Sequence, residues 1–143
     1  MLRKLTSTSA TWATVPLRLA LGGTFIAHGA QKVLGKFGGK GWGWWISQSQ
    51  MVPFPFMRPT WLWLAAAGLA ELVGGILVLL GLFTRLGAFL IVCVMLTAIK
   101  VLWPAFFPPA GSELAVVMLA MALALLISGG GLVSADRLIS MKK

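Results

Sequence analysis

A single carboxylate, Glu71, interrupts the long apolar segment WLWLAAAGLAELVGGILVLLGLF, which runs from Trp61 to Phe83. If these 23 residues form a helix, it is roughly 34 Å long and can cross a hydrocarbon layer of about 30 Å. An acid near the middle of a membrane costs on the order of 2.5–3.5 kcal/mol unless a partner compensates it. The sequence therefore predicts a membrane-spanning helix and a polar partner for Glu71.

The composition agrees with a membrane protein. Of the 143 residues, 59% are hydrophobic and 10% are charged, whereas a soluble domain carries about 25% charged residues. The net charge of +9 comes from lysines and arginines that are scattered between apolar runs. Without a basic helix face we do not expect nucleic acid as a partner, and the basic residues instead favour contact with anionic lipid.

Four apolar segments predict an all-α fold, an integral membrane four-helix bundle. The expected helices cover residues 15–34, 60–83, 86–103 and 113–132. Pro16 suits a first helical turn, and Pro104 and the three glycines after residue 128 are typical helix ends. Arg18 lies in the first turn of the first span, where its side chain is expected to reach out to the membrane surface.

The segment 35–59, between the first two spans, contains five glycines, three tryptophans and three prolines. Tryptophan collects at headgroup depth, so we expect an interfacial loop with a short helix over residues 44–50. Two interpretations stay open. The loop is either an aromatic anchor in the outer interface or a lid over a pocket between helices, which would suit a flat ligand.

Basic residues near the helix ends predict the orientation. If both termini lie inside, the inner side holds seven basic residues against three outside. The inner set is Arg3, Lys4, Arg18, Arg85, Arg137, Lys142 and Lys143, and the outer set is Lys36, Lys40 and Arg58. The positive-inside rule then predicts a multi-pass protein of the inner (cytoplasmic) membrane with both termini in the cytoplasm.

Depth along the helices suggests partners for Glu71. Glu71 and His28 each lie twelve residues from the inner end of their segments, or about 18 Å, and Lys100 lies about 21 Å from the end of its own. We therefore expect His28 as the partner in preference to Lys100, which is closer to Glu113. The predicted polar or ligand-binding cluster is His28, Gln31, Lys32, Glu71, Lys100 and Glu113.

The role of Glu71 stays open between three alternatives. It is part of an ion pair that fixes helix register, or it exchanges protons or binds a ligand, or it is a neutral acid bonded to a backbone carbonyl. His28 is the only histidine, so we expect no metal site. No nucleophile lies beside a base in the sequence, so no catalytic residue is assigned.

Three segments resemble the DoxX family of small bacterial and archaeal membrane proteins. They are RLALGGTFIAHGAQKVLGKFGG (18–39), AELVGGILVLLGLFTRLGAFLIVCVMLTAI (70–99) and FFPPAGSELAVVMLAMALALLISGGG (106–131). The motifs HGxQK, AELxGG and LGLxTR carry the resemblance, which implies one DoxX-like transmembrane domain over residues 1–143. It places these residues at family motif positions: His28, Gln31, Lys32, Glu71, Arg85 and Glu113.

The resemblance also implies a function, because the family is named from a sulfur-oxidising, quinone-reducing archaeal complex. We expect an accessory or quinone-proximal subunit of a membrane redox assembly, with no covalently bound cofactor and with quinone or lipid as a possible bound molecule. Its partners would be the lipid bilayer and either other membrane subunits or further copies of this chain. The alternative is a small homo-oligomeric, proton-coupled transporter that uses Glu71. Whether the protein is itself an enzyme is left open.

Overall fold

The computed structural model describes residues 8–9, 11–107 and 111–141. Within this part of the chain all regular structure is helical, without β-strands, which confirms the all-α class. The elements are α2 (Thr14–Val33), α3 (Trp42–Ile46), the 3-10 helix η1 (Ser49–Met51), α4 (Thr60–Leu80), α5 (Thr84–Leu102), α6 (Glu113–Ser128) and α7 (Ala135–Met141). Four residues of the orientation argument lie outside the described residues: Arg3, Lys4, Lys142 and Lys143.

Among the described residues, two helices are long and apolar enough to cross a membrane by length and composition. α4 has 21 residues and α5 has 19, each with a mean hydropathy of 2.1. α6 is also apolar but has only 16 residues. The four-helix membrane bundle therefore stays a prediction for α2 and α6.

Glycines end the helices earlier than the apolar runs suggest. The second and fourth helices were expected to reach residues 83 and 132, but α4 stops at Leu80 and α6 at Ser128. Gly81 and Gly129 follow them with φ of 66° and 74°. Gly81 is in the left-handed αL conformation that is typical of a helix C-terminus. Gly129 has a positive φ with an extended ψ of −161°, which costs glycine little.

The segment between α2 and α4 is more divided than expected. Instead of one helix over residues 44–50 it forms α3, Trp42–Ile46, and then η1, Ser49–Met51. Gly41 precedes α3 with φ of 79°, which sets the turn that begins this short helix.

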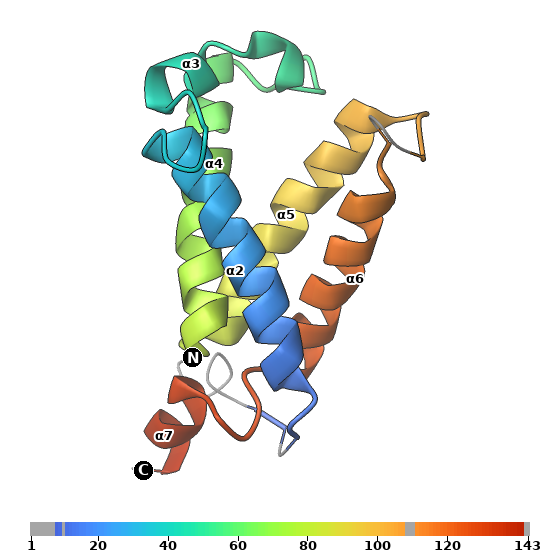
Figure 1. Cartoon of the computed structure of the whole chain (residues 1–143). Coiled ribbons are helices and arrows are strands. Elements are labelled where there is room, and N and C mark those ends of the chain that lie inside the picture. The colour runs from blue at the N-terminus through green and yellow to red at the C-terminus, as the bar shows by residue number, and fades with distance from the viewer. Residues whose placement is uncertain (1–7, 10, 108–110, 142–143) are drawn as a thin grey trace.

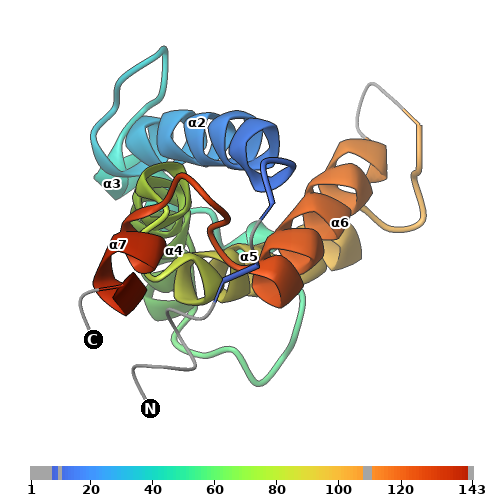
Figure 2. The same cartoon turned by 90° about the horizontal axis from the view of Figure 1, so that it is seen from below.

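Figure 1 shows how the long helices are arranged: α2 runs along α4, and α6 runs along α5. The backbone N–H of Ser9 donates to the carbonyl of Ser128 at 2.9 Å, so the described start of the chain lies beside the end of α6. α7 lies at this same end, near the last turn of α4, as Figure 2 shows from below. Both ends of the described chain are therefore on one side of the molecule, opposite α3.

Small residues allow α2 and α4 to approach closely. A Cβ atom on Gly22 would lie 2.9 Å from the backbone nitrogen of Leu79, and one on Gly75 would lie 2.7 Å from that of Ile26. Contacts this short leave no room for any side chain. Close backbone packing through glycine is typical of helix pairs in membranes.

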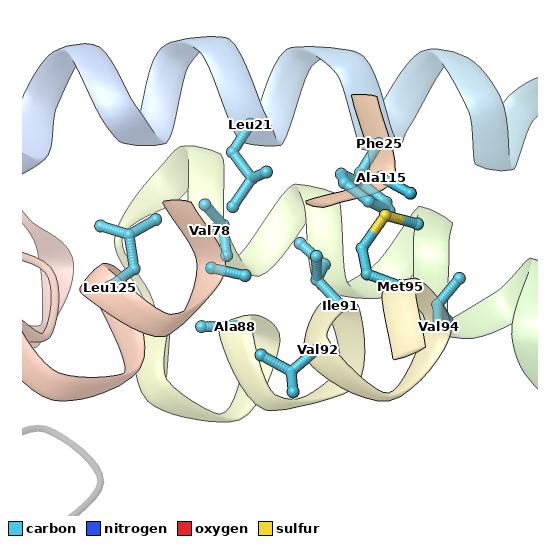
Figure 3. Packing of buried hydrophobic residues seen from close by; sticks show 11 residues of the cluster. Leu21, Phe25, Val78, Ala88, Ile91, Val92, Val94, Met95, Ala115 and Leu125 are labelled. Atoms are coloured by element: carbon cyan, nitrogen blue, oxygen red, sulfur yellow. The ribbon is translucent and has the colours of Figure 1, made fainter. Parts of the chain in front are cut away.

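A buried apolar cluster joins α2, α4, α5 and α6 at the centre of the molecule (Figure 3). Its fully buried members include Leu21 of α2, Val78 of α4, Ile91 of α5 and Leu125 of α6, each with an exposed fraction of 0%. The four long helices thus share one core, which fixes α4 relative to α5 below the candidate site.

Candidate functional site

Lys32 of α2 is the partner of Glu71 of α4. Its Nζ lies 2.5 Å from Oε1 and 2.6 Å from Oε2 of the carboxylate. Glu71 is 3% exposed. The expectation of a buried acid with a polar partner is therefore right, but the preference for His28 is wrong.

The directions of the side chains explain this difference. α2 and α4 run antiparallel, and a Cβ atom on Gly29 would lie 2.5 Å from the backbone nitrogen of Leu72, which sets their register. Lys32 lies beyond that level toward α3, and each helical side chain leans toward its own N-terminus. Lys32 and Glu71 therefore lean toward each other, whereas the side chain of His28 is exposed.

Trp45 of α3 covers the ion pair. The Nζ of Lys32 lies 4.4 Å from the centre of the Trp45 ring, a geometry in which the ring face attracts the ammonium. The indole Nε1 donates to the carbonyl of Leu64 at 2.6 Å. A Cβ atom on Gly68 would lie 3.1 Å from Nε1, so the lack of a side chain at this glycine allows the Trp45 ring to pack against α4.

The other residues of the predicted cluster lie elsewhere. Gln31 donates from Nε2 to the carbonyl of Phe37 at 3.0 Å and so holds the turn after α2. Lys100 is exposed on the last turn of α5. Glu113 is half-buried in the first turn of α6, where a negative charge is favourable. Among the described residues, only Lys32 makes an ion pair with Glu71.

A pocket of about 530 Å³ lies between α4 and α5 beside this ion pair. Its end nearest to α3 is formed by Met51, Val52, Pro53, Met57 and Trp45. Its lining residues are Lys32, Trp45, Met51, Val52, Pro53, Met57, Trp63, Leu64, Ala66, Ala67, Ala70, Glu71, Leu90, Cys93, Val94, Thr97, Ala98, Val101 and Leu102.

The sequence of the two helices explains the pocket. A Cβ atom on Gly87 of α5 would lie 2.9 Å from the carbonyl oxygen of Gly74 of α4, so the helices nearly touch there. From that point α5 leans away from α4 toward the α3 end (Figure 1). Alanines line the α4 side of the space that this divergence creates, at positions 66, 67 and 70.

The pocket suits an apolar molecule with one polar group. Its volume is within the range of about 300–1,000 Å³ that is typical of small-molecule sites, which combine apolar walls with a few polar groups. Apart from Lys32 and Glu71, the lining includes the hydroxyl of Thr97, which donates to the carbonyl of Cys93 at 2.9 Å. The ammonium of Lys32 has three N–H donors, and the two carboxylate oxygens of Glu71 accept from it. Lys32 therefore has a third N–H that can donate to a ligand.

A second polar cluster lies at the opposite end of the helices, around Arg18. This residue was expected at the membrane surface, but it is 7% exposed. Its guanidinium donates to the carbonyls of Val78 at 3.0 Å, Leu79 at 2.8 Å and Gly130 at 3.1 Å, and also to that of Val133. The last carbonyls of a helix have no partner within the helix, so Arg18 satisfies the end of α4.

Asp136 of α7 completes this cluster, and the sequence analysis missed it. The carboxylate is 1% exposed and accepts hydrogen bonds from the backbone N–H groups of Phe83 at 2.7 Å and Thr84 at 2.9 Å. It therefore caps the start of α5. The available signal was Ser134, whose hydroxyl accepts from the N–H of Arg137 at 3.2 Å and marks the beginning of a helix.

The fold and the site define a small, all-helical protein with two helices of membrane-spanning length and an ion pair beside an apolar pocket. A family model described as DoxX matches residues 13–106. The chain belongs to the DoxX family. The matched part includes Lys32 and Glu71 but not Glu113. No curated protein and no solved structure matches the chain.

Proposed function

We propose that this DoxX family protein is a four-helix integral membrane protein of the inner membrane and a quinone-proximal accessory subunit of a membrane redox assembly. Its pocket between α4 and α5 would hold the quinone headgroup. The observation that carries the proposal is the apolar pocket of about 530 Å³ with the Lys32–Glu71 ion pair in its wall.

The membrane arrangement has support from the helices and the charges. α4 and α5 are apolar over a membrane-spanning length, and α2 and α6 share a core with them. Both described chain ends lie on one side, as four crossings require. Apart from the buried Arg18, and from Lys32 and Lys100 within the helix ends, the sequence assigns six basic residues to the proposed inner side against three in the segment between α2 and α4. Four of the six lie outside the described residues. Both termini are cytoplasmic in the proposed orientation.

A quinone headgroup matches the chemistry of the pocket. It is a flat ring with carbonyl oxygens that accept hydrogen bonds, and its substituent is apolar. The ammonium of Lys32 is a donor for one carbonyl, and the indoles of Trp45 and Trp63 are aromatic walls for the ring. The segment of residues 51–57 would then act as a lid.

Binding is tested with a short-tailed benzoquinone and the protein purified in a mild detergent. A bound quinone quenches nearby tryptophans, so we expect saturable quenching of the intrinsic fluorescence. Ala67→Phe fills the pocket and should abolish this quenching. Leu69→Phe is the matched control, because Leu69 is 45% exposed on the same helix and lies outside the pocket lining. Equal quenching in the two variants would contradict the proposal.

The role of Lys32 is tested in the same assay. Lys32→Met removes the donor but keeps an apolar chain of similar length. Loss of a hydrogen bond from a charged group costs roughly 1.5–3 kcal/mol, so the apparent quinone affinity should fall by about tenfold or more. An unchanged affinity would mean that the headgroup does not meet Lys32.

The proton-coupled transporter stays the alternative, because Glu71 itself lines the pocket. Purification from native membranes in a mild detergent separates the two functions. A larger assembly that carries redox subunits and quinone supports the accessory role. A bare homo-oligomer, in which Glu71→Gln assembles normally but loses transport, supports the transporter.

A further inference from the structure

We infer that the pocket opens sideways into the hydrocarbon layer between α4 and α5 and that its ligand is a tailed amphiphile which enters from the bilayer. The polar head lies at Lys32 and Glu71, and the tail leaves through this lateral mouth. The inference deepens the proposed function and rests on it for the membrane crossing of α4 and α5 and for the identity of the headgroup.

The mouth is marked by the lining residues that are exposed. Three of the exposed lining residues lie on the two helices: Trp63 and Ala66 of α4 and Cys93 of α5. The fourth, Met51, belongs to η1. In contrast, Glu71 and Val94 line the same pocket and are buried. The ion pair is therefore at the inner wall, and the opening lies at the outer edges of the two helices.

The position of Cys93 places this opening in the hydrocarbon layer. Cys93 is the middle residue of α5, nine residues from Thr84 and nine from Leu102, which is about 13 Å from each end. α4 and α5 are the two helices that qualify as membrane spans. Phe89 and Leu96, one turn on either side of Cys93, are 52% and 55% exposed. A surface of this kind at that depth faces lipid chains and not water.

Apolar side chains line the end of the pocket toward α3, where Met51 is 42% exposed. Val52, Pro53 and Met57 line it there, together with the ring of Trp45. A ligand from the aqueous side would have to displace this lid, whereas one in the bilayer meets the mouth directly. A tail that stays among lipid chains loses no apolar contact when the head binds. The shape therefore selects an amphiphile with a small hydrogen-bond-accepting head and one apolar chain.

The direction of the mouth is tested with Cys93, the only cysteine of the chain. A nitroxide is attached to Cys93, the full protein is placed in bilayers, and collisions with oxygen and with a water-soluble nickel chelate are measured. Two references are made in a Cys93→Ala background: Leu96→Cys on the outer face of α5, and Ser49→Cys in η1. We expect the Cys93 nitroxide to behave like the Leu96→Cys one, with more oxygen than nickel contact. A preference for nickel, as at an aqueous site, would overturn the inference.

The tail is tested with an amide that carries a brominated alkyl chain and has no quinone ring. Bromine quenches tryptophan at short range, so we expect a saturable quenching that is lost in Trp63→Phe and kept in Trp61→Phe. Trp61 is the matched control, because it is exposed on α4 but does not line the pocket. Ala66→Phe should close the mouth and remove the saturable part. Quenching that never saturates, or that Ala66→Phe leaves unchanged, would overturn the inference.

The two tests separate this inference from the proposed function. If the benzoquinone does not bind but the Cys93 nitroxide contacts oxygen and the brominated amide saturates, the quinone function fails and the lateral mouth stands. If the benzoquinone binds but the Cys93 nitroxide contacts nickel, the quinone function stands and the lateral mouth fails.

Discussion

The ammonium of Lys32 lies within 2.6 Å of both carboxylate oxygens of Glu71, so one bidentate ion pair joins α2 to α4 beside the pocket. The two side chains are not equally buried: that of Lys32 is 23% exposed and that of Glu71 is 4% exposed. The charge of Glu71 therefore relies on the ion pair more than the charge of Lys32 does, because the buried carboxylate is almost out of reach of solvent, whereas the ammonium is partly exposed.

This dependence predicts the effects of breaking the pair. Lys32→Met leaves a buried carboxylate without its cation, and we expect a loss of about 3–5 kcal/mol of unfolding free energy. Glu71→Leu leaves a partly exposed ammonium, and the expected loss is smaller, about 1–3 kcal/mol. The double variant should recover most of the loss, because apolar side chains replace a buried pair well. Denaturant titration in detergent, followed by tryptophan fluorescence, measures all three. A double variant less stable than both single variants would contradict this.

Two neighbouring glycines of α2 should respond in opposite ways to alanine. A Cβ atom on Gly22 would lie 2.9 Å from the backbone nitrogen of Leu79, whereas nothing lies within 4 Å of one on Gly23. Gly22→Ala must separate α2 from α4 and should destabilise the protein. Gly23→Ala should stabilise it by about 0.5–1 kcal/mol, because alanine is the better helix former. Thermal unfolding compares the two variants, and a lower midpoint for Gly23→Ala would argue against the packing.

Arg18→Lys should not be a conservative change. The guanidinium reaches four backbone carbonyls, those of Val78, Leu79, Gly130 and Val133, and an ammonium cannot match this planar set of donors. Leaving buried carbonyls unpaired should cost roughly 1–3 kcal/mol of stability. Arg58→Lys is the control, because Arg58 is exposed. The same unfolding midpoint in both variants would show that the planar arrangement of the guanidinium donors of Arg18 does not contribute to stability.

Asp136→Ala should loosen the start of α5. It removes the acceptor of the N–H groups of Phe83 and Thr84, and loss of such a helix cap costs about 0.5–2 kcal/mol. Amide hydrogen exchange should become faster at these two residues. Leu138→Ala, at a 65% exposed position of the same helix, is the control. If exchange at Phe83 and Thr84 is equal in the two variants, Asp136 does not cap α5.

The sequence predicts the limits of a helix well where they coincide with the ends of an apolar run. The start of α4 at Thr60 and the end of α5 at Leu102 agree with the expected limits within a residue, since proline precedes one and follows the other closely. Helix ends that are set by a backbone turn were harder to predict from the sequence. The left-handed Gly81 ends α4 three residues before the apolar run ends at Phe83, because periodicity carries no information about φ.

The candidate site was predictable only in part. The single acid in an apolar helix correctly indicated that Glu71 is buried and paired. Which residue pairs with Glu71 is decided by the register of α2 against α4 and by the direction in which each side chain points. A depth calculated by counting residues from the helix ends takes account of neither. Arg18 was expected at the membrane surface and Asp136 was not singled out, for another reason: their partners are backbone groups at the ends of other helices, and residue types do not reveal such partners.

The cluster around Arg18 and Asp136 also bears on the order in which the chain is made. α4 and α5 form a hairpin, but the acceptor that caps α5 belongs to α7, which is translated after both of them. Arg18, in contrast, is translated long before its acceptors at Gly130 and Val133 exist. The hairpin of α4 and α5 is therefore made before these contacts exist, and they form only after residues 130–136 have been translated and have packed beside Arg18 and the start of α5. A chain truncated after residue 128 should accordingly contain all four long helices but lack the contacts of Gly130, Val133 and Asp136 that close the end around Arg18.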